Sequence, residues 1–321
     1  MKKTLLALAV MTAAGTANAA VMYDDNDVTV TIKGDIDVHY IKTSDKNQDA
    51  QIAVDDADFG FGLKYNVTDE LAVGGALNID GDASIDEDGQ DENQGIEVNE
   101  VYVGLMYGPN TLTFGEQYTV RDDSGIGGDY EFGLAGAVDN SDFYGPQVVK
   151  YVYDAGEMFY GAASFSAYEN GAKGRVDGDS ETDIRLGARV ADFDFTVYLG
   201  KTKKSQVDED HYILEGRYTL DALELAATYA ASTTDNGVAG TADVDTDVIG
   251  VAATYTLSEQ VSFAAGYSIM DNDTAGSKEV GQGYVNTTYN FTSQVWSYAE
   301  VGFTDEDNKD TAYVVGMGVK F

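Results

Sequence analysis

The side chains that could carry out chemistry are few in type and unevenly supplied. The 321 residues include no cysteine and two histidines, His39 and His211, which lie on different predicted strands. The chain therefore has few side chains suited to a zinc site or a His-based catalytic triad, and no nucleophile motif accompanies the histidines. Among 56 Asp and Glu, acid pairs suited to glycoside hydrolysis would occur anywhere and are uninformative. We expect no enzyme, no cofactor and no metal centre.

One acidic stretch, residues 78–92, invites interpretation as a calcium loop, because hard cations prefer several oxygen ligands. Counted from Asn78 or Asp80, however, the sixth position, which must be glycine, is Ala83 or Ile85. A solvated acidic loop is the favoured interpretation. Weak binding of divalent cations there is the alternative.

The balance of charge narrows the class of partner. The chain has 19 Lys and Arg against 56 acids, which gives a formal net charge of −37. Nucleic acid is excluded as a partner because its phosphates are bound through basic side chains. Small cations are the natural counter-ligands of such a chain, unless the acidity only keeps an exported or salt-adapted protein soluble.

The start of the chain has the layout of a cleavable secretory signal. Two early lysines are followed by an apolar run over residues 5–11 and by small residues ending at Ala19. We therefore expect residues 1–19 to be removed and residues 20–321 to form one domain. No other stretch of about 18 apolar residues follows, so a helical membrane anchor is not expected.

Apolar and polar residues alternate along much of the chain, which is typical of strands with two different faces. From Val28 to Tyr40 one face is apolar and the other polar, and the same period returns in residues 59–65, 223–229, 261–269 and 313–321. The 36 Gly and 22 Tyr, beside 2 Pro, suit many strands joined by tight turns. The pattern predicts an all-β fold.

The connectors between these segments alternate in length. Seven are short, around residues 66–70, 108–110, 154–156, 191–192, 220–221, 257–259 and 292–293. Eight are mostly longer and polar, around residues 42–51, 80–95, 119–146, 169–181, 204–209, 233–245, 271–281 and 305–309. Together they predict a sixteen-stranded antiparallel transmembrane β-barrel, with short turns at one rim and long loops at the other.

Two features favour a membrane barrel over a soluble sandwich. Aromatic residues lie on the apolar face beside the short turns, where an interfacial girdle belongs: Tyr65, Tyr107, Tyr153, Tyr218, Tyr255 and Phe291. The terminal Phe321 resembles the C-terminal aromatic signature of bacterial outer-membrane barrels. An open sheet edge in hydrocarbon would leave backbone groups unpaired, so the last strand should pair with the first.

Four segments carry a more specific resemblance: Val38-His39-Tyr40, Ala57-Asp58-Phe59-Gly60-Phe61, the Leu-Thr-Phe-Gly-Glu-Gln-Tyr of residues 112–118, and Glu131-Phe132-Gly133. With them the chain resembles the general (trimeric) porin family of Gram-negative outer membranes over nearly its whole length. The resemblance implies a homotrimer surrounded by lipid and lipopolysaccharide, with periplasmic turns and extracellular loops, that passes small hydrophilic solutes. It also implies that the third loop, residues 119–146, folds into the lumen.

In that family, loop carboxylates face basic residues of the wall across a constriction, and here the wall departs from the pattern. Glu131 matches the family's loop carboxylate before Phe-Gly, and Asp129 is a looser match. Asp58 and Glu116 stand where the family usually has arginine, and Lys150 is a remaining basic candidate. Alternation alone also turns Asp58 into the lumen. The resemblance thus implies a negative constriction that favours cations.

Further side chains should face the lumen by alternation: Lys33, Arg185, Arg189, Arg217, Trp296 and Tyr298. The arginines either line the path or pair with lumen carboxylates such as Asp183, Glu215 and Glu224. The two aromatic residues either stack sugars or pack against the inserted loop. The rival functions are a substrate-specific porin, a barrel that serves mainly as an adhesin or structural anchor, and a secreted calcium-binding β protein.

Overall fold

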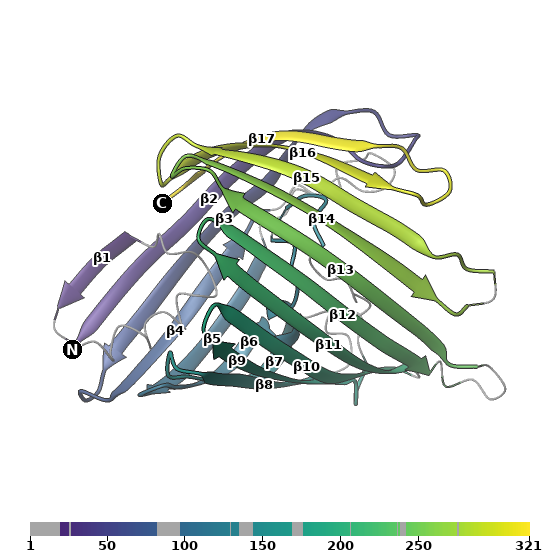
Figure 1. Ribbon diagram of the computed structural model, residues 1–321. Coiled ribbons are helices and arrows are strands. Elements are labelled where there is room, and N and C mark those ends of the chain that lie inside the picture. Colours follow the sequence, from purple (N-terminus) through teal and green to yellow (C-terminus); the bar gives the residue numbers. More distant parts are fainter. Residues whose placement is uncertain are drawn as a thin grey trace.

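The alternating segments form strands, and in the computed structural model the strands close into a barrel (Figure 1). The structure describes residues 20–25, 27–81, 97–128, 130–134, 144–168, 176–205, 207–235, 237, 242–274 and 276–321. The predicted signal and most of the acidic stretch 78–92 lie outside these residues. One short 3₁₀ helix, η1 (Val120–Asp123), occurs among them. No described helix is both long enough and apolar enough to cross a membrane.

Within the described residues, sixteen consecutive strands form one antiparallel ring. They are β2 (Val28–Lys42), β3 (Gln51–Asn66), β4 (Leu71–Asp80), β5 (Glu97–Tyr107), β6 (Asn110–Tyr118), β7 (Tyr144–Asp154), β8 (Phe159–Ala167), β9 (Ser180–Val190), β10 (Phe193–Lys204), β11 (Val207–Leu220), β12 (Leu223–Asp235), β13 (Val244–Thr256), β14 (Val261–Asn272), β15 (Val280–Asn290), β16 (Val295–Thr304) and β17 (Ala312–Lys320). The ring closes where β17 pairs with β2. The predicted strand number and the predicted closure are confirmed.

A further short strand, β1 (Ala20–Asp25), was not expected from the sequence. It pairs antiparallel with residues 28–32 at the start of β2. Along the same edge of β2, the backbones of Phe321 and Gly34 exchange hydrogen bonds of 2.9 and 3.1 Å, and β17 covers the remainder. The start of β2, which β17 does not reach, therefore still has a backbone partner.

Short and long connectors lie at opposite rims, as predicted, but the expected loop at residues 204–209 is wrong. There β10 and β11 stay paired up to their last residues. Ser205 adopts a left-handed backbone with φ of 60°, which permits a tight turn. Lys201 also lies 3.2 Å from Asp210 across the ladder. The polar residues that suggested a loop belong to the ends of two strands and the tight turn between them.

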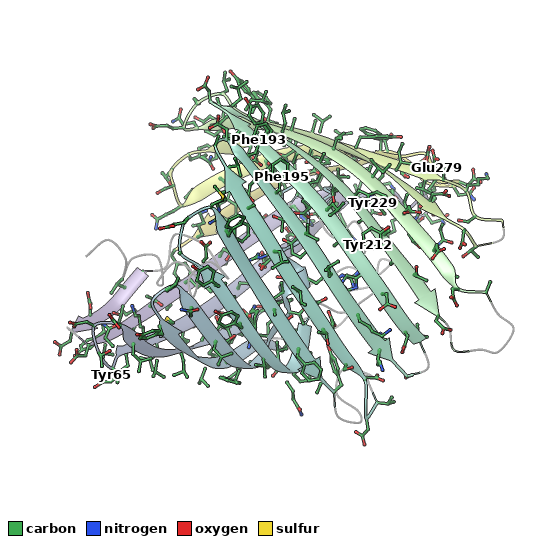
Figure 2. The ribbon with its side chains drawn as sticks, turned by 60° about the horizontal axis from the view of Figure 1, so that its bottom comes forward. Tyr65, Phe193, Phe195, Tyr212, Tyr229 and Glu279 are labelled. Carbon is green, nitrogen blue, oxygen red and sulfur yellow. The ribbon has the colours of Figure 1, made fainter. Side chains whose placement is uncertain are left out.

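The outward face of the barrel is apolar, and its side chains project from the wall in Figure 2. Leu186 and Val251, for example, are 58% and 53% exposed. Such residues alternate with inward ones along every strand that spans the wall, because successive side chains point to opposite faces. A continuous band of this kind is stable when lipid hydrocarbon covers it.

Aromatic side chains mark both borders of this band. The six expected at the short-turn rim all lie within two residues of the end of a strand there: Tyr65, Tyr107, Tyr153, Tyr218, Tyr255 and Phe291. Phe193 stacks on Tyr218 with ring centroids 4.5 Å apart. Toward the long-loop rim, the rings of Tyr212 and Tyr229 lie 5.9 Å apart (Figure 2). Aromatic rings toward both ends of the strands fit the two interfaces of a bilayer.

On the lumen side, aromatic rings lie close over glycines of the neighbouring strand. A Cβ atom at Gly318 would lie 2.0 Å from the Trp296 ring, and one at Gly316 would lie 2.3 Å from the Tyr298 ring. Only glycine leaves room for these contacts. Trp296 and Tyr298 do face the lumen, but the packing partner seen here is β17, whereas the inserted loop was the partner expected.

Replacing an outward residue near the middle of the wall should reduce stability. Val251 lies beside the centre of β13, so Val251→Arg places a charge in hydrocarbon, at a cost of about 2–4 kcal/mol. Leu257→Arg, in the short turn after β13, is the matched control and should cost about 0–1 kcal/mol near the interface. Guanidinium unfolding in lipid vesicles measures both, and equal costs would contradict the depth assigned to Val251.

Candidate functional site

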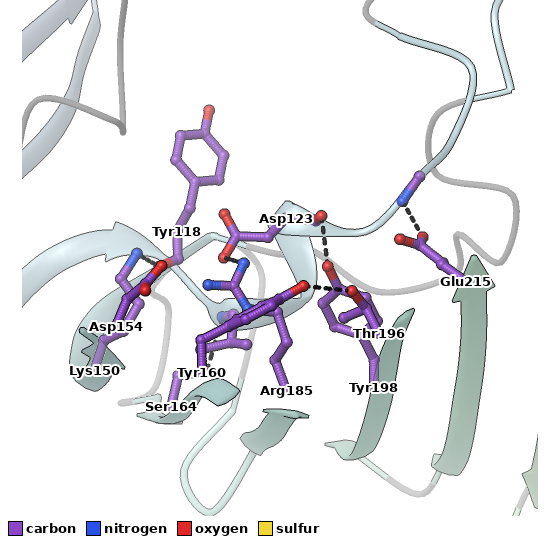
Figure 3. A network of polar contacts seen from close by, with 12 residues as sticks. Tyr118, Asp123, Lys150, Asp154, Tyr160, Ser164, Arg185, Thr196, Tyr198 and Glu215 are labelled. Carbon is purple, nitrogen blue, oxygen red and sulfur yellow. Dashed lines mark hydrogen bonds and ion pairs between the residues drawn. The ribbon is translucent and has the colours of Figure 1, made fainter. Parts of the chain in front are cut away.

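The connector between β6 and β7, residues 119–143 and called L3 below, is described at residues 119–128 and 130–134. Its beginning lies against the lumen wall formed by β8 to β11 (Figure 3). The Val120 amide donates to Ser164 Oγ at 2.9 Å, and the Tyr198 hydroxyl donates to the Asp123 carbonyl at 2.7 Å. The expectation that the third loop enters the lumen therefore holds for these residues.

One buried cation anchors this part of L3. Arg121 is 0% exposed, and its Nη1 lies 3.3 Å from Glu209 Oε1 and 3.2 Å from His211 Nδ1. The other ring nitrogen of His211 lies 3.1 Å from Asp183 Oδ1. A charge inside a protein is stable only when paired and hydrogen-bonded, so these contacts hold L3 to β9 and β11.

The rest of L3 follows the wall around the barrel. The Gly125 amide donates to Glu215 Oε1 at 2.6 Å on β11, and Ile126 packs against alanines of β12 and β13. The Tyr284 hydroxyl of β15 donates to the Gly127 carbonyl at 2.6 Å. On β16, Glu300 accepts the Phe132 amide at 2.7 Å. The described residues of L3 thus line the wall from β8 to β16. The opposite stretch, β2 to β6, is called the open wall below, because few of these described residues reach it.

The open wall carries a cluster of aspartates that we call the acidic block: Asp35, Asp37, Asp55, Asp56 and Asp58. The register sets Asp35 opposite Asp58 and Asp37 opposite Asp56 on the two paired strands. Asp55 is the extra residue of a β-bulge between the Asp37–Asp56 pair and the Val38–Val54 pair. Like charges directly opposite one another are destabilising, so this arrangement favours a nearby cation.

Asp58 also lines a lumen cavity of about 420 Å³, together with Lys33, Asp80, Glu100 and Tyr118. Asn78 donates to the Glu100 carboxylate in this cavity. Lys150 projects inward, as predicted, and its Nζ donates to the Tyr118 carbonyl at 2.9 Å. The structure therefore brings Asp58, Lys33 and Lys150 to the same part of the wall.

Glu116 is placed differently from the expectation. The β5 to β6 register sets it opposite Val101, an outward residue, and a bulge toward β7 separates Gly115 from Gln117. The expectation for Glu116 rested on the family resemblance, and because a bulge interrupts the alternation of faces, parity does not settle which face its side chain takes. Its carboxylate interacts with the Tyr144 hydroxyl and is not among the described residues lining the cavity around Asp58. A constriction role for Glu116 stays a prediction.

On L3, Glu131 reaches the open wall. Its Oε2 lies 3.8 Å from Nδ1 of the buried His39, which in turn lies 3.9 Å from Asp55 Oδ2. Glu131 is thus next to the acidic block, on the side of L3 that faces β2 and β3. Asp129 lies outside the described residues.

The three lumen arginines are paired with carboxylates, which is the second of the two interpretations given above. Arg185 pairs with Asp123 of L3 at 2.5 Å, Arg189 with Asp154 at 2.8 Å, and Arg217 with Glu215 at 3.0 Å. Of the three carboxylates suggested as partners, Glu215 is the one these pairs use. Their positive charge is therefore largely neutralised by their neighbours.

Sequence reasoning missed Asp35, Asp37, Asp55 and Asp56 as candidate site residues. Alternation turns the first two inward. The sequence also shows that β2 and β3 are joined by one connector, which indicates that they are neighbours in the sheet. An acid at each of two alternate positions on both strands predicts facing acid pairs once the register is known. The bulge at Asp55 has no comparable signal in the sequence.

The comparisons with known proteins agree with this architecture. The model of the Gram-negative porin family matches residues 4–309. The chain belongs to this family. Porin-like protein H of Photobacterium profundum is 34% identical to this porin, covering 100% of both chains. It follows that the barrel is a porin-type channel of the Gram-negative outer membrane.

Solved structures share the fold at lower identity. The trimer form of OmpT from Vibrio cholerae is 21% identical, with a TM-score of 0.75, and covers 92% of this chain and 100% of that one. The anion-selective porin from Comamonas acidovorans is 14% identical, with a TM-score of 0.73 and the same two coverages. At these identities the likeness shows the fold alone.

Removing the buried cation should loosen L3. Arg121→Met leaves Glu209 buried without its guanidinium partner, and breaking a buried pair in this way costs about 3–5 kcal/mol. Amide hydrogen exchange over residues 119–128, followed by mass spectrometry, should become faster.

The matched control is Lys278→Met in an exposed outer loop. Lys278 lies 2.5 Å from Asp307, and this ion pair lowers the pKa of Asp307 and raises the pKa of Lys278. Because exposed pairs contribute little to stability, exchange in L3 should not change. Unchanged exchange in Arg121→Met would contradict the anchoring role.

Proposed function

We propose that this porin is a general diffusion channel for small hydrophilic solutes and ions, and that its constriction favours cations. The observation that carries the proposal is the acidic block on the open wall, with Glu131 of L3 beside it. Negative charge from the wall and from L3 therefore gathers on the same side of the passage. This differs from the pattern implied by the family resemblance, in which acids face bases.

The basic side chains of the lumen do not offset this charge. Arg185, Arg189 and Arg217 already lie against carboxylates. Among the described residues that line the cavity around Asp58, Lys33 is the basic one and stands beside five acids: Asp35, Asp56, Asp58, Asp80 and Glu100. The net charge along the open wall is therefore negative.

The expected strength of selectivity follows from screened electrostatics. At ~5 Å and an effective dielectric constant near 20, one unit charge changes the energy of a passing ion by about 3 kcal/mol. A Debye length of about 8 Å at physiological salt reduces this contribution in a water-filled pore. We expect a cation preference of several-fold to tens-fold. The fold shared with an anion-selective porin does not oppose it, because side chains and not strands set the charge.

Selectivity should respond to charge reversal in the acidic block. Under a KCl gradient across a planar bilayer, the reversal potential of the wild type should show preference for K⁺ over Cl⁻. Asp58→Arg should reduce that preference several-fold, since it exchanges an attractive charge for a repulsive one at the wall. Asp58→Asn removes the negative charge without adding a positive one and should reduce it less.

Glu279→Arg is the matched control, because it makes the same charge change at an exposed position on the outer rim (Figure 2). Its selectivity should stay close to that of the wild type. An anion-selective or unselective wild type would refute cation selectivity. If the cation preference falls equally in Asp58→Arg and Glu279→Arg, selectivity depends on the total charge of the protein and not on the acidic block.

We also propose a homotrimer embedded in outer-membrane lipid and lipopolysaccharide. It is supported by the likeness in fold to the trimer form of OmpT from Vibrio cholerae. Single-molecule insertion into a planar bilayer should give three equal conductance steps, which close one at a time under high voltage. Single-step closure would contradict three pores per unit, and no conductance would favour an anchor. Liposome swelling with sugars of graded size should show rates that fall smoothly with size, as for a general channel.

A further inference from the structure

Three elements place possible metal ligands together at the end of the described part of L3. His39 comes from β2, Asp55 from the bulge of β3 and Glu131 from L3. The His39 Nδ1 atom lies 3.9 Å from Asp55 Oδ2 and 3.8 Å from Glu131 Oε2, and one ligand atom from each residue lies within 4.8 Å of the others. His39 is 5% exposed, whereas both carboxylates reach solvent.

These distances are close to those of an occupied site. Zinc binds imidazole nitrogen and carboxylate oxygen at about 2.0–2.2 Å, which separates tetrahedral ligands by about 3.4 Å. Each carboxylate would need to move only a few tenths of an ångström toward His39. Glu131 sits on a loop and Asp55 on a bulge, both of which adapt more easily than a regular ladder.

The surroundings hold the imidazole in position. The Tyr298 hydroxyl donates to Asp37 Oδ1 at 3.3 Å and lies 3.4 Å from His39 Nδ1. Tyr298 is itself fixed by its packing over Gly316. A hydroxyl that can donate to Asp37 leaves the nitrogen lone pair available for a metal, and neighbours of this kind orient metal ligands in proteins.

At the second histidine, His211, a protein side chain already supplies the cation. The two ring nitrogens of His211 face different carboxylates, Asp183 and Glu209, and so cannot join them in one coordination sphere. Arg121 supplies the cation there, 3.2 Å from Nδ1. At His39, by contrast, a single nitrogen faces both carboxylates.

We propose that His39, Asp55 and Glu131 form a binding site for a divalent transition-metal ion of the zinc class. One nitrogen and two oxygens suit Zn²⁺, Ni²⁺ or Cu²⁺, whereas Mg²⁺ and Ca²⁺ prefer all-oxygen sites. The bound ion links L3 to the β2 and β3 wall and places two positive charges beside the acidic block. It therefore lowers the passage of other cations. Binding does not depend on the proposed cation selectivity, and it is measured separately.

Isothermal titration of the detergent-solubilised barrel with ZnCl₂ tests binding directly. We expect one Zn²⁺ per barrel with an affinity that falls at least tenfold in His39→Gln and in Glu131→Gln. Glu279→Gln, which removes an exposed acid from the outer rim, is the matched control and should keep the wild-type affinity. Mg²⁺ should bind the wild type and His39→Gln with equal affinity, because binding by carboxylate oxygens alone does not need the imidazole.

A conductance measurement tests the consequence. The ratio of single-channel K⁺ current with and without Zn²⁺ should be below one in the wild type and should return toward one in His39→Gln. Zinc affinity that is the same in the wild type, His39→Gln and Glu131→Gln would overturn the site. Binding that depends on His39 without any change in current would keep the site and overturn its effect on transport. Neither result alters the reversal potentials that test cation selectivity.

Discussion

The hydrogen bonds between β17 and β2 are the interaction on which the rest of the molecule depends. They remove the last sheet edge, and a strand edge in hydrocarbon would leave several backbone groups without partners. Once the ring is closed, each residue of a strand must face either lipid or lumen. The apolar outer band, the two aromatic girdles and the polar interior all follow from this division.

The lumen face then obeys a second requirement, because its charged groups need partners inside a confined space. L3 supplies many of them between β8 and β16, where Arg121 reaches Glu209 and Asp123 reaches Arg185. On the opposite wall the contact with described residues of L3 is that of Glu131 with His39, and aspartates such as Asp58 line a lumen cavity. The asymmetry of the pore is therefore a result of the path of L3 as much as of composition.

Much of this could be predicted from the sequence, because alternation and connector length are local signals. They give the sixteen strands and the inward direction of Lys150 and Arg185. They left open whether the lumen arginines pair with carboxylates, as Arg217 does with Glu215. What could not be predicted depends on register between strands. A bulge turns Glu116 away from a simple alternation, and the pairing of β2 with β3 sets Asp35 against Asp58. The count of two histidines argued against a metal site. A count, however, cannot show which carboxylates L3 brings to His39.

The short strand β1 has a consequence for how the barrel is assembled. The β1 to β2 pairing joins residues close in sequence, so the loop it closes is small and can form early. The β17 to β2 pairing joins the two ends of the chain and is a slow, non-local contact. In the closed ring β1 occupies the beginning of β2 up to Ile32, next to the point where Phe321 pairs with Gly34. The last strand can then dock in one register, because sliding further along β2 would require it to displace β1.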